Sequence, residues 1–329
     1  MKAALYRRFG PAEAVLEVVD LPTPDPGPGE VLVEVHASAV NPSDVKLRAG
    51  LRPGAEMSYD YVVPHSDGAG VVAAVGTGVD PARVGQRVWL WNGQWQRQHG
   101  TAASHILLPA EQAVALPDPV SVEHGAMLGI PAMTAWAAVM GDGPVGGQTV
   151  LVTGAAGRVG RYAVQMARLA GARVIATVSA AKAAGVSSLV AGPHEIIDYR
   201  TEDVAARVME ITRGQGVARI VDVDFAANLA VTQAVLAPGG TVVGYASSGP
   251  HPAPLAFTTF MFRNQRIWTL IVYLLDPIRR RLGEAQLTTW LSQGLIEHDA
   301  TMSLPLSRIA EAHTAVEASR PGGVLVTPD

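Results

Sequence analysis

One stretch near the middle of the chain decides the fold: Thr149-Val150-Leu151-Val152-Thr153-Gly154-Ala155-Ala156-Gly157-Arg158-Val159-Gly160. An apolar run typical of a buried strand leads into three glycines spaced as a tight turn, and apolar residues at helical spacing follow over 161–170. A strand, a glycine turn and a helix N-terminus together form a binding site for the pyrophosphate of a dinucleotide. Gly154 permits the turn, Gly157 lets the backbone approach phosphate, and Gly160 lets helix and strand pack closely.

The composition excludes several classes of protein. The 329 residues include 25 Lys and Arg against 29 Asp and Glu, and the net charge of −4 gives no reason to expect a nucleic-acid or anionic-membrane partner. Hydrophobic residues make up 48% and charged residues 16%, as in a compact α/β enzyme with extensive burial. The absence of cysteine excludes disulfides, thiolate nucleophiles and cysteine-ligated zinc.

Two segments bear on membranes and targeting. The apolar segment 125–141 is shorter than the roughly 20 residues that span a bilayer, and it contains Pro131 and Thr134, so we expect a buried helix. The residues Met1–Arg8 contain no apolar core of a signal peptide. We therefore expect a soluble, cytoplasmic protein.

Before the glycine stretch, the sequence predicts short strands. Alternating polar and apolar residues over 30–36 indicate a half-buried strand, whereas the Pro- and Gly-rich run 22–29 cannot lie inside a sheet. The other strands expected here are 2–6, 16–19, 71–75 and 86–90. Short strands at this spacing predict a compact barrel or sandwich.

From about residue 119, strand and helix patterns alternate. The expected strands are 149–153, 173–178, 195–199, 219–223, 241–245 and 267–274, and the expected helices between them are 161–170, 203–211 and 229–236. Alternation of this kind predicts a mostly parallel, doubly wound sheet with helices on both faces. Helices over 277–293 and 306–319 and a strand over 323–327 follow.

The end of the second expected strand of this sheet discriminates between cofactors. An acidic residue there would bind both ribose hydroxyls and favour NADH, but the segment 178–182 contains none. Ser179 and Lys182 suit a 2′-phosphate instead, and Tyr199 and Arg200 end the next strand near the same corner. The sequence therefore favours NADPH over NADH. The alternative for Lys182 is that it is an ordinary solvated residue of a helix and has no role in cofactor binding.

Arg158 is unusual for its place in the turn. A third small residue is expected there, between Gly157 and Val159. Its guanidinium either reaches the pyrophosphate or projects into solvent, and the sequence does not choose between these two.

Several blocks together resemble the medium-chain dehydrogenase/reductase superfamily, and within it the zinc-independent quinone oxidoreductases of the zeta-crystallin type. Besides the glycine stretch, the blocks are 26–33, 40–44, 66–72, 129–135 and 237–240. The resemblance implies a GroES-like β-barrel domain built from residues 1–124 and 275–329, and a Rossmann NADPH-binding domain over 125–274. It further implies an active site in the cleft between the domains, and homodimers or homotetramers.

The resemblance also implies cofactor contacts. Those to the pyrophosphate are Gly154, Ala156, Gly157, Arg158, Val159 and Gly160, and those to the adenosine ribose and its 2′-phosphate are Ser179, Lys182 and Tyr199. Those near the nicotinamide ribose are Gly244, Tyr245, Ala246, Ser247, Asn228, Leu270 and Val272. Arg52 stands where relatives often have a cofactor-contacting tyrosine, so that contact is not carried over.

Zinc-dependent relatives place cysteine and histidine ligands near Asn41 and near Ser66 and Asp67. This chain has no cysteine, and His65 with Asp67 alone cannot supply the three protein ligands that a catalytic zinc normally has. We therefore predict catalysis without a metal.

Three residues of the strand-rich part, between the expected strands 30–36 and 71–75, are candidate substrate contacts. Asn41 can donate to a carbonyl substrate, or it is only a turn residue before a proline. Tyr59 and Tyr61 can stack on a planar ring or donate a phenolic proton, or they only pack. Asp44 is expected to cap the helix that follows.

The segment 89–100 concentrates three of the six tryptophans. It either offers an aromatic face to a flat substrate or is a surface loop or subunit contact. His99, within it, is a candidate proton donor.

Three functions follow, in order of preference. The first is NADPH-dependent reduction of quinones, by hydride or single-electron transfer to a planar conjugated carbonyl. The second is reduction of activated C=C bonds in enones or enoyl thioesters, which needs a proton donor such as Tyr59, Tyr61 or His99. The third, a non-enzymatic binding protein, is disfavoured for RNA by the net charge of −4.

Overall fold

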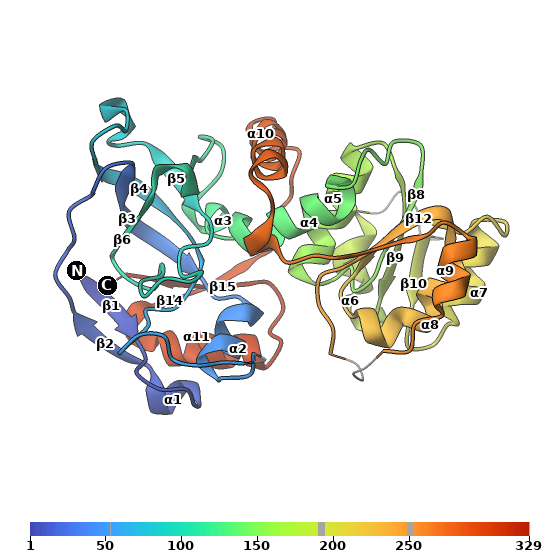
Figure 1. Ribbon diagram of the computed structural model, residues 1–329, viewed down its shortest axis with the longest axis horizontal. Helices are drawn as coiled ribbons and strands as arrows, with labels where there is room; N and C mark the ends of the chain where they lie inside the picture. Colours follow the sequence, from blue (N-terminus) through green and yellow to red (C-terminus); the bar gives the residue numbers. More distant parts are fainter. Residues whose placement is uncertain (53, 190–194, 249–252, 329) are drawn as a thin grey trace. The chain divides into compact units, whose positions relative to one another are not determined.

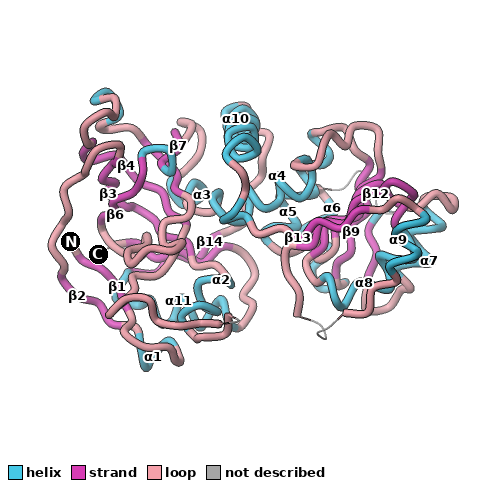
Figure 2. Tube along the Cα trace, viewed as in Figure 1, coloured by secondary structure: helices cyan, strands magenta, loops and turns pink. Residues whose placement is uncertain are grey.

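The structure is a computed structural model that describes residues 1–52, 54–189, 195–248 and 253–328. The chain divides into two compact units: Met1–Ile130 together with Glu284–Asp329, and Pro131–Gly283. Figures 1 and 2 show that the first unit is rich in strands and loops, whereas helices flank the sheet of the second. None of the helices in the described part of the chain has the length and apolarity needed to cross a bilayer.

The first unit contains a seven-stranded sheet to which both ends of the chain contribute. Its strands follow the order β14-β15-β3-β4-β5-β7, and β6 pairs with β3. Their bounds are β3 Glu30–Ala39, β4 Asp67–Val75, β5 Arg87–Leu90, β6 His105–Pro109, β7 Ala113–Ala115, β14 Thr301–Pro305 and β15 Gly323–Thr327. A separate antiparallel pair joins β1 (Lys2–Leu5) and β2 (Glu17–Asp20). The patterns in the sequence did not predict β6, β7 and β14.

Two strands of this sheet extend beyond their expected bounds. β3 continues past residue 36 to Ala39, and β4 begins at Asp67 rather than at Val71. The added part of β4 contains glycines, which on their own disfavour strands. A Cβ on Gly70 would lie 1.9 Å from the carbonyl oxygen of Glu34, so only glycine allows the two strands this close.

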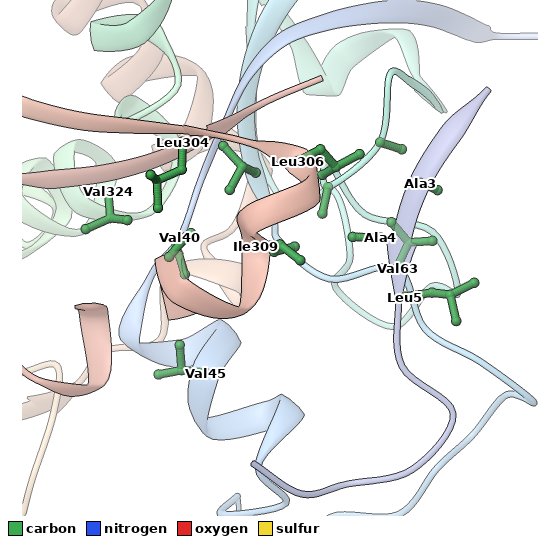
Figure 3. Packing of buried hydrophobic residues seen from close by; sticks show 14 residues of the cluster. Ala3, Ala4, Leu5, Val40, Val45, Val63, Leu304, Leu306, Ile309 and Val324 are labelled. Atoms are coloured by element: carbon green, nitrogen blue, oxygen red, sulfur yellow. The ribbon is translucent and has the colours of Figure 1, made fainter. Parts of the chain in front are cut away.

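The first unit has four short helices: α1 Ala12–Val15, α2 Pro42–Arg48, α3 Val122–Gly125 and α11 Ile309–Glu317. α3 and α11 pack on strands of the sheet, and α1 and α2 pack on α11. Figure 3 shows the core beneath them, where Leu5 of β1, Leu304 of β14 and Ile309 of α11 pack with Val40 and Val324. These residues come from both ends of the chain. Burial of their side chains, at roughly 1.5–3 kcal/mol for each large one, therefore holds the chain ends together.

The second unit contains a parallel six-stranded sheet in the order β10-β9-β8-β11-β12-β13. The strands are β8 Thr149–Val152, β9 Arg173–Val178, β10 Ile196–Asp198, β11 Val217–Asp222, β12 Leu236–Gly244 and β13 Arg266–Thr269. The helices are α4 Met133–Met140, α5 Arg158–Leu169, α6 Ala180–Ser187, α7 Val204–Ile211, α8 Phe225–Val235 and α9 Phe257–Phe262. The division between the units falls within α10, Pro277–Ser292. The order reverses between β8 and β11, which is the switch point where such sheets bind ligands. The predicted α/β fold class is confirmed.

The expected strand 267–274 is wrong beyond Thr269. β13 pairs with β12 from Arg266 to Thr269, and the chain then turns into a 3-10 helix over Val272–Leu274. Because β12 ends at Gly244, opposite Thr269, no strand in the described part of the chain continues the ladder beside the later residues.

The expected helix 125–141 is buried as predicted, but it is not continuous. α3 ends at Gly125, a π-helical turn covers Leu128–Ala132, and α4 begins at Met133. Pro131 lies inside the π-helical turn and has no N–H to donate, so regular helical bonding cannot run through this segment.

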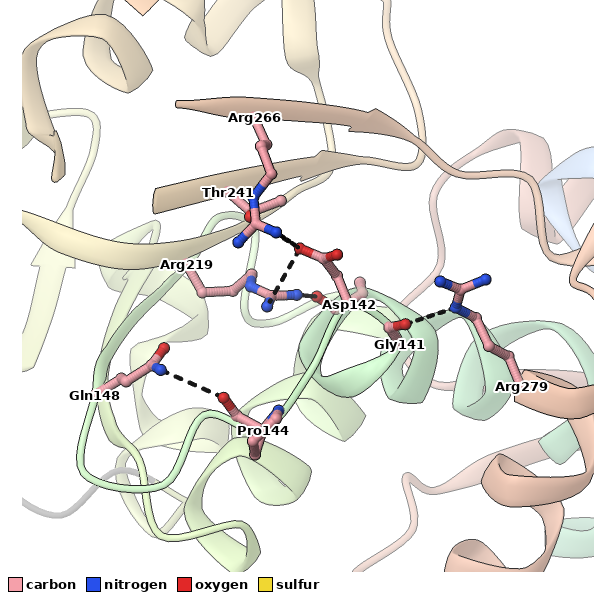
Figure 4. A network of polar contacts seen from close by, with 9 residues as sticks. Gly141, Asp142, Pro144, Gln148, Arg219, Thr241, Arg266 and Arg279 are labelled. Carbon is pink, nitrogen blue, oxygen red and sulfur yellow. Dashed lines mark hydrogen bonds and ion pairs between the residues drawn. The ribbon is translucent and has the colours of Figure 1, made fainter. Parts of the chain in front are cut away.

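A polar row crosses the sheet of the second unit (Figure 4). Arg219 of β11, Thr241 of β12 and Arg266 of β13 are in register, and their side chains converge on Oδ2 of Asp142. The hydroxyl of Thr241 donates over 3.0 Å, and the two guanidinium groups lie 3.8 and 3.4 Å from the same oxygen. Since Asp142 follows α4, these contacts attach the end of that helix to the sheet.

The first unit buries two histidines against each other. Nε2 of His65 lies 2.9 Å from Nε2 of His313, and the two side chains are 1% and 0% exposed. Burial lowers the pKa of His65 to about 3, and burial together with His65 and Arg48 lowers that of His313 well below its usual value. Both imidazoles are therefore neutral at pH 7.

The free energy of unfolding should fall as the pH is lowered from about 6.5 toward 3. In this window the unfolded imidazoles bind protons and the folded ones do not, so each histidine adds a slope of up to about 1.4 kcal/mol per pH unit. We expect His313→Gln to give a shallower slope than the wild type in urea titrations at pH 7, 6 and 5. Equal slopes in the two proteins would contradict this assignment.

Candidate functional site

The glycine turn lies between β8 and α5 at the switch point of the second unit. Gly154 has a φ of +61°, which glycine adopts without strain, as predicted for the turn. A Cβ on Gly160 would lie 2.5 Å from the carbonyl oxygen of Gly154, so this glycine lets the helix pack against the turn itself. Gly157 is the exposed N-cap residue of α5.

The N-terminus of α5 is open to an anion. No side chain caps it, and its first turn contains no acidic residue. The amide N–H groups of a first helical turn have no acceptor within the helix, so they remain donors for a phosphate. Arg158 begins the helix and is half-buried, and its Nη1 is withdrawn from solvent, which disfavours the interpretation that its guanidinium projects into solvent.

Neighbouring strands hold the turn. The hydroxyl of Thr177, near the end of β9, accepts from the N–H of Gly154 over 3.2 Å. Oδ1 of Asp222, which ends β11, accepts from the hydroxyl of Thr153 over 2.9 Å and from the amide of Asn228 over 2.7 Å. Asn228 is thus a neighbour of the turn through Asp222, a residue that sequence reasoning missed.

The residues predicted for the adenosine ribose lie at the adjacent ends of β9 and β10. Ser179 is the buried N-cap residue of α6, and Lys182 is exposed in the first turn of that helix. The N–H of Tyr199 donates to the carbonyl of Val178 over 3.2 Å, which brings Tyr199 beside Ser179. Asp198, the last residue of β10, accepts from the N–H of Arg200 over 3.0 Å.

A cavity of about 430 Å³ opens at the ends of β12 and β13. Its lining includes five residues predicted for the nicotinamide side: Gly244, Tyr245, Ala246, Ser247 and Leu270. Val272 does not line it, because that residue is buried in the 3-10 helix that follows β13. Burial, with a smaller contribution from Asp222, raises the pKa of Tyr245, so its phenol is neutral at pH 7.

In the first unit, hydrogen bonds fix both the backbone and the side chain of Asn41. It is the N-cap of α2 and 2% exposed. Contrary to expectation, Asp44 does not precede the helix but lies in its first turn, where its carboxylate accepts from the N–H of Asn41 over 2.7 Å and completes a capping box. Nδ2 of Asn41 donates to Oδ2 of Asp67 over 2.9 Å. The same oxygen accepts from the N–H of Ile130 over 2.8 Å.

The two candidate tyrosines differ in their surroundings. The hydroxyl of Tyr61 lies 3.0 Å from Nε2 of His99, and the two rings stack with centroids 5.7 Å apart. Burial lowers the pKa of His99, so its imidazole is neutral at pH 7. Tyr59 is more exposed, and its hydroxyl donates to the carbonyl of Gln96 over 3.1 Å.

The expected aromatic face of 89–100 does not include its first tryptophan. Trp89 lies within β5 and is 0% exposed, because it pairs with both β4 and β7 inside the sheet. Trp95 lies in the loop, where the guanidinium of Arg52 sits 5.9 Å from the centre of its ring. Only the later tryptophans are therefore candidates for a surface contact.

The residues near Asn41 do not fit a zinc site. Nδ1 of His65 lies 2.9 Å from the hydroxyl of Ser38, and its Nε2 bonds to His313, so both ring nitrogens have hydrogen-bond partners. Oδ2 of Asp67 already accepts two hydrogen bonds. Within residues 1–52, 54–189, 195–248 and 253–328, no group of three or more His, Asp or Glu is placed to hold a metal ion.

Comparisons with known proteins agree with this architecture. Residues 27–118 match the alcohol dehydrogenase GroES-like domain, and residues 159–285 match the zinc-binding dehydrogenase family. A quinone oxidoreductase from Pseudomonas aeruginosa is 30% identical over 99% of this chain and 98% of its own length. The structure of mycobacterial Rv1454c complexed with NADPH is 31% identical, has a TM-score of 0.85 and covers 100% of both chains.

A further relative carries a different name. The trans-enoyl reductase tndF from Aspergillus flavipes is 35% identical over 60% of this chain and 59% of its own length. The full-length similarity and the two matched domains show that this chain belongs to the medium-chain dehydrogenase/reductase family of oxidoreductases.

Proposed function

We propose that this protein is an NADPH-dependent reductase of quinones that works without zinc. The observation that carries the proposal is the N-terminus of α5, which has neither a capping side chain nor an acidic residue in its first turn. Such a terminus suits a pyrophosphate, and the end of β9 beside it has Ser179 and Lys182 in place of the acidic residue that favours NADH. The NADPH in the similar mycobacterial structure supports the same cofactor.

The second unit offers a place for each part of this cofactor. The turn at Gly154–Gly160 would hold the pyrophosphate, Ser179, Lys182 and Tyr199 the 2′-phosphate, and the cavity at Gly244–Ser247 the nicotinamide side. When bound, NADPH supplies a hydride or single electrons to the acceptor.

We assign the contact with the acceptor to Asn41. Its Nδ2 carries two hydrogens, of which one donates to Asp67. The second hydrogen is the donor that we assign to the oxygen of the quinone, where negative charge develops during reduction. Water supplies the protons, so the chain needs no acid of its own for this reaction.

The runner-up is a reductase of C=C bonds in enones or enoyl thioesters. The contact of Tyr61 with a neutral His99 favours it, because saturation of an alkene places a proton on carbon and a phenol in a hydrogen-bonded pair can provide that proton. The similarity to a trans-enoyl reductase supports the same alternative.

We further propose that the protein forms homodimers or homotetramers. β13 is the last strand of the six-stranded sheet, and among the described residues no strand pairs with its outer side. Ile271 and Leu274, which follow it, are 46% and 66% exposed. A second copy that pairs along β13 would cover these side chains, and sedimentation velocity would detect it.

Lys182→Ala should weaken NADPH binding by about 10-fold and leave NADH binding unchanged, because only NADPH carries the 2′-phosphate. Fluorescence titration of both cofactors measures this, with the exposed helical lysine Lys46→Ala as the control that changes neither. Tighter binding of NADH than of NADPH by the wild type would overturn the choice of cofactor.

Asn41→Ala should lower kcat/KM for a naphthoquinone by roughly 100-fold, as does removal of a donor to a developing oxyanion. The dissociation constant for NADPH should not change. Asp80→Ala removes a comparable helix cap, since Oδ1 of Asp80 accepts from the N–H of Ala82, and it should keep full activity. Wild-type kinetics in Asn41→Ala would refute this role.

Tyr61→Phe distinguishes the two reactions. If the chain reduces enones, this variant should lose roughly 100-fold in enone turnover, because the phenolic proton is gone. Turnover of a naphthoquinone by the same preparation should stay at the wild-type rate. Enone turnover by the wild type without any quinone turnover would replace the first proposal by the second.

A further inference from the structure

His65 has a backbone conformation that is rare for residues other than glycine. Its φ is +74°, in the left-handed region, although it carries a bulky side chain. A neighbouring segment of the same unit fixes this backbone, because the N–H of Thr101 donates to the carbonyl of His65 over 2.9 Å. Backbone conformations of this kind persist only where the surroundings hold them, and they gather near functional sites.

The imidazole of His65 is part of a buried chain of hydrogen bonds. His313 of α11 bonds to His65 over 2.9 Å, His65 to Ser38 of β3 over 2.9 Å, and Ser38 to Thr101 over 2.7 Å. The hydroxyl of Thr101 then donates to the backbone carbonyl of Asp67 over 2.6 Å. All four side chains are at most 1% exposed.

The direction of this chain follows from its last bond. A carbonyl only accepts, so Thr101 donates to Asp67, and Ser38 must then donate to Thr101. Ser38 accordingly accepts from Nδ1–H of His65, and His65, being neutral, accepts at Nε2 from His313. Every donor in the series has one acceptor, which fixes the tautomers of both histidines.

This series of hydrogen bonds ends at Asp67, the residue whose carboxylate holds Asn41. While the carbonyl of Asp67 accepts from Thr101, its Oδ2 accepts from Asn41 and from the N–H of Ile130. The fit around this carboxylate is close, since a Cβ on Gly129 would lie 2.3 Å from its Oδ1. A shift of the backbone at Asp67 therefore moves the amide of Asn41.

This series of hydrogen bonds cannot conduct a proton to Asn41, because it ends at the backbone carbonyl of Asp67, which does not take up a proton at neutral pH. Among the residues that the structure describes, Nδ1 of His313 has no hydrogen-bond partner, although it is buried. An unpaired buried nitrogen disfavours the folded state, so stability alone does not account for the pair.

We propose that the His313–His65 pair is a positioning device for Asn41, which it holds in place through Ser38, Thr101 and Asp67. The proposal rests on the contact assigned above between Asn41 and the quinone. The two histidines and Ser38 touch no reacting atom and act only through the placement of the amide.

Two variants break the chain at different points, and a third is the control. His65→Gly removes the imidazole and keeps the backbone, because glycine adopts a positive φ without strain. Ser38→Ala removes one hydroxyl in the middle of the chain. Ser104→Ala breaks a similar serine–histidine contact outside the chain, since Oγ of Ser104 lies 3.1 Å from Nδ1 of His105.

Two readouts are measured on the full-length protein. The first is hydrogen exchange at the amide of Ile130, with the amide of Val72, which donates to Gln86, as the internal reference. The second is steady-state reduction of a naphthoquinone, together with the dissociation constant for NADPH. We expect His65→Gly and Ser38→Ala to speed exchange at Ile130 relative to Val72 by about 10-fold and to lower kcat by about 10-fold, with NADPH binding unchanged.

Unchanged exchange at Ile130 in either folded variant would overturn the proposal, and so would faster exchange with wild-type kcat. If His65→Gly does not fold, Ser38→Ala decides alone by the same two readouts. Failure of the wild type to reduce any quinone would refute the proposed function instead, and the exchange data would still decide whether the pair holds Asp67.

Discussion

One carboxylate oxygen, Oδ2 of Asp67, holds two separate segments of the first unit in place. It accepts from the amide of Asn41 and from the N–H of Ile130, which lie 26 and 63 residues away in the sequence. A carboxylate withdrawn from water is costly unless its oxygens accept such bonds. The N-terminus of α2 and the segment after α3 therefore share one anchor, at the first residue of β4.

The second unit uses an aspartate in a comparable way. Asp222 ends β11 and is 0% exposed, and its Oδ1 accepts from Thr153 and Asn228. The glycine turn is thereby fixed to the strand next to β8 as well as to β8 itself. In both units, a buried carboxylate that has no proposed contact with the substrate thus orients a candidate residue, Asn41 in the first unit and Asn228 in the second.

The parts of the fold that local sequence encodes could be predicted. The glycine turn, the apolar pattern of each strand around it and the contact of Asp44 with the N-terminus of α2 depend on residues within a few positions of one another. The absence of an acidic residue over 178–182 is read directly from the sequence. The expected strand 267–274 fails because its length is set by β12, which the local apolar pattern does not report.

The contacts that orient the candidate site could not be predicted in the same way. Asn41 was singled out, but its bond to Asp67 depends on how β4 packs beside α2. His65 was considered only as an inadequate zinc ligand, since its partner His313 lies 248 residues further along the chain. Trp89 belongs to the expected strand 86–90, which is confirmed as β5, but the local pattern does not reveal that β4 and β7 pair on both sides of this strand and leave the tryptophan buried.

The sheet of the first unit also sets an order for folding during synthesis. The second unit occupies one continuous stretch, Pro131–Gly283, so all its strands are synthesised before β14 and β15. β3 has to wait, because Ser38 and Ala39 pair with Val326 and Leu325 of β15. Until those residues emerge, the nascent chain presents an unpaired strand segment, which is a template for aggregation and for binding by chaperones.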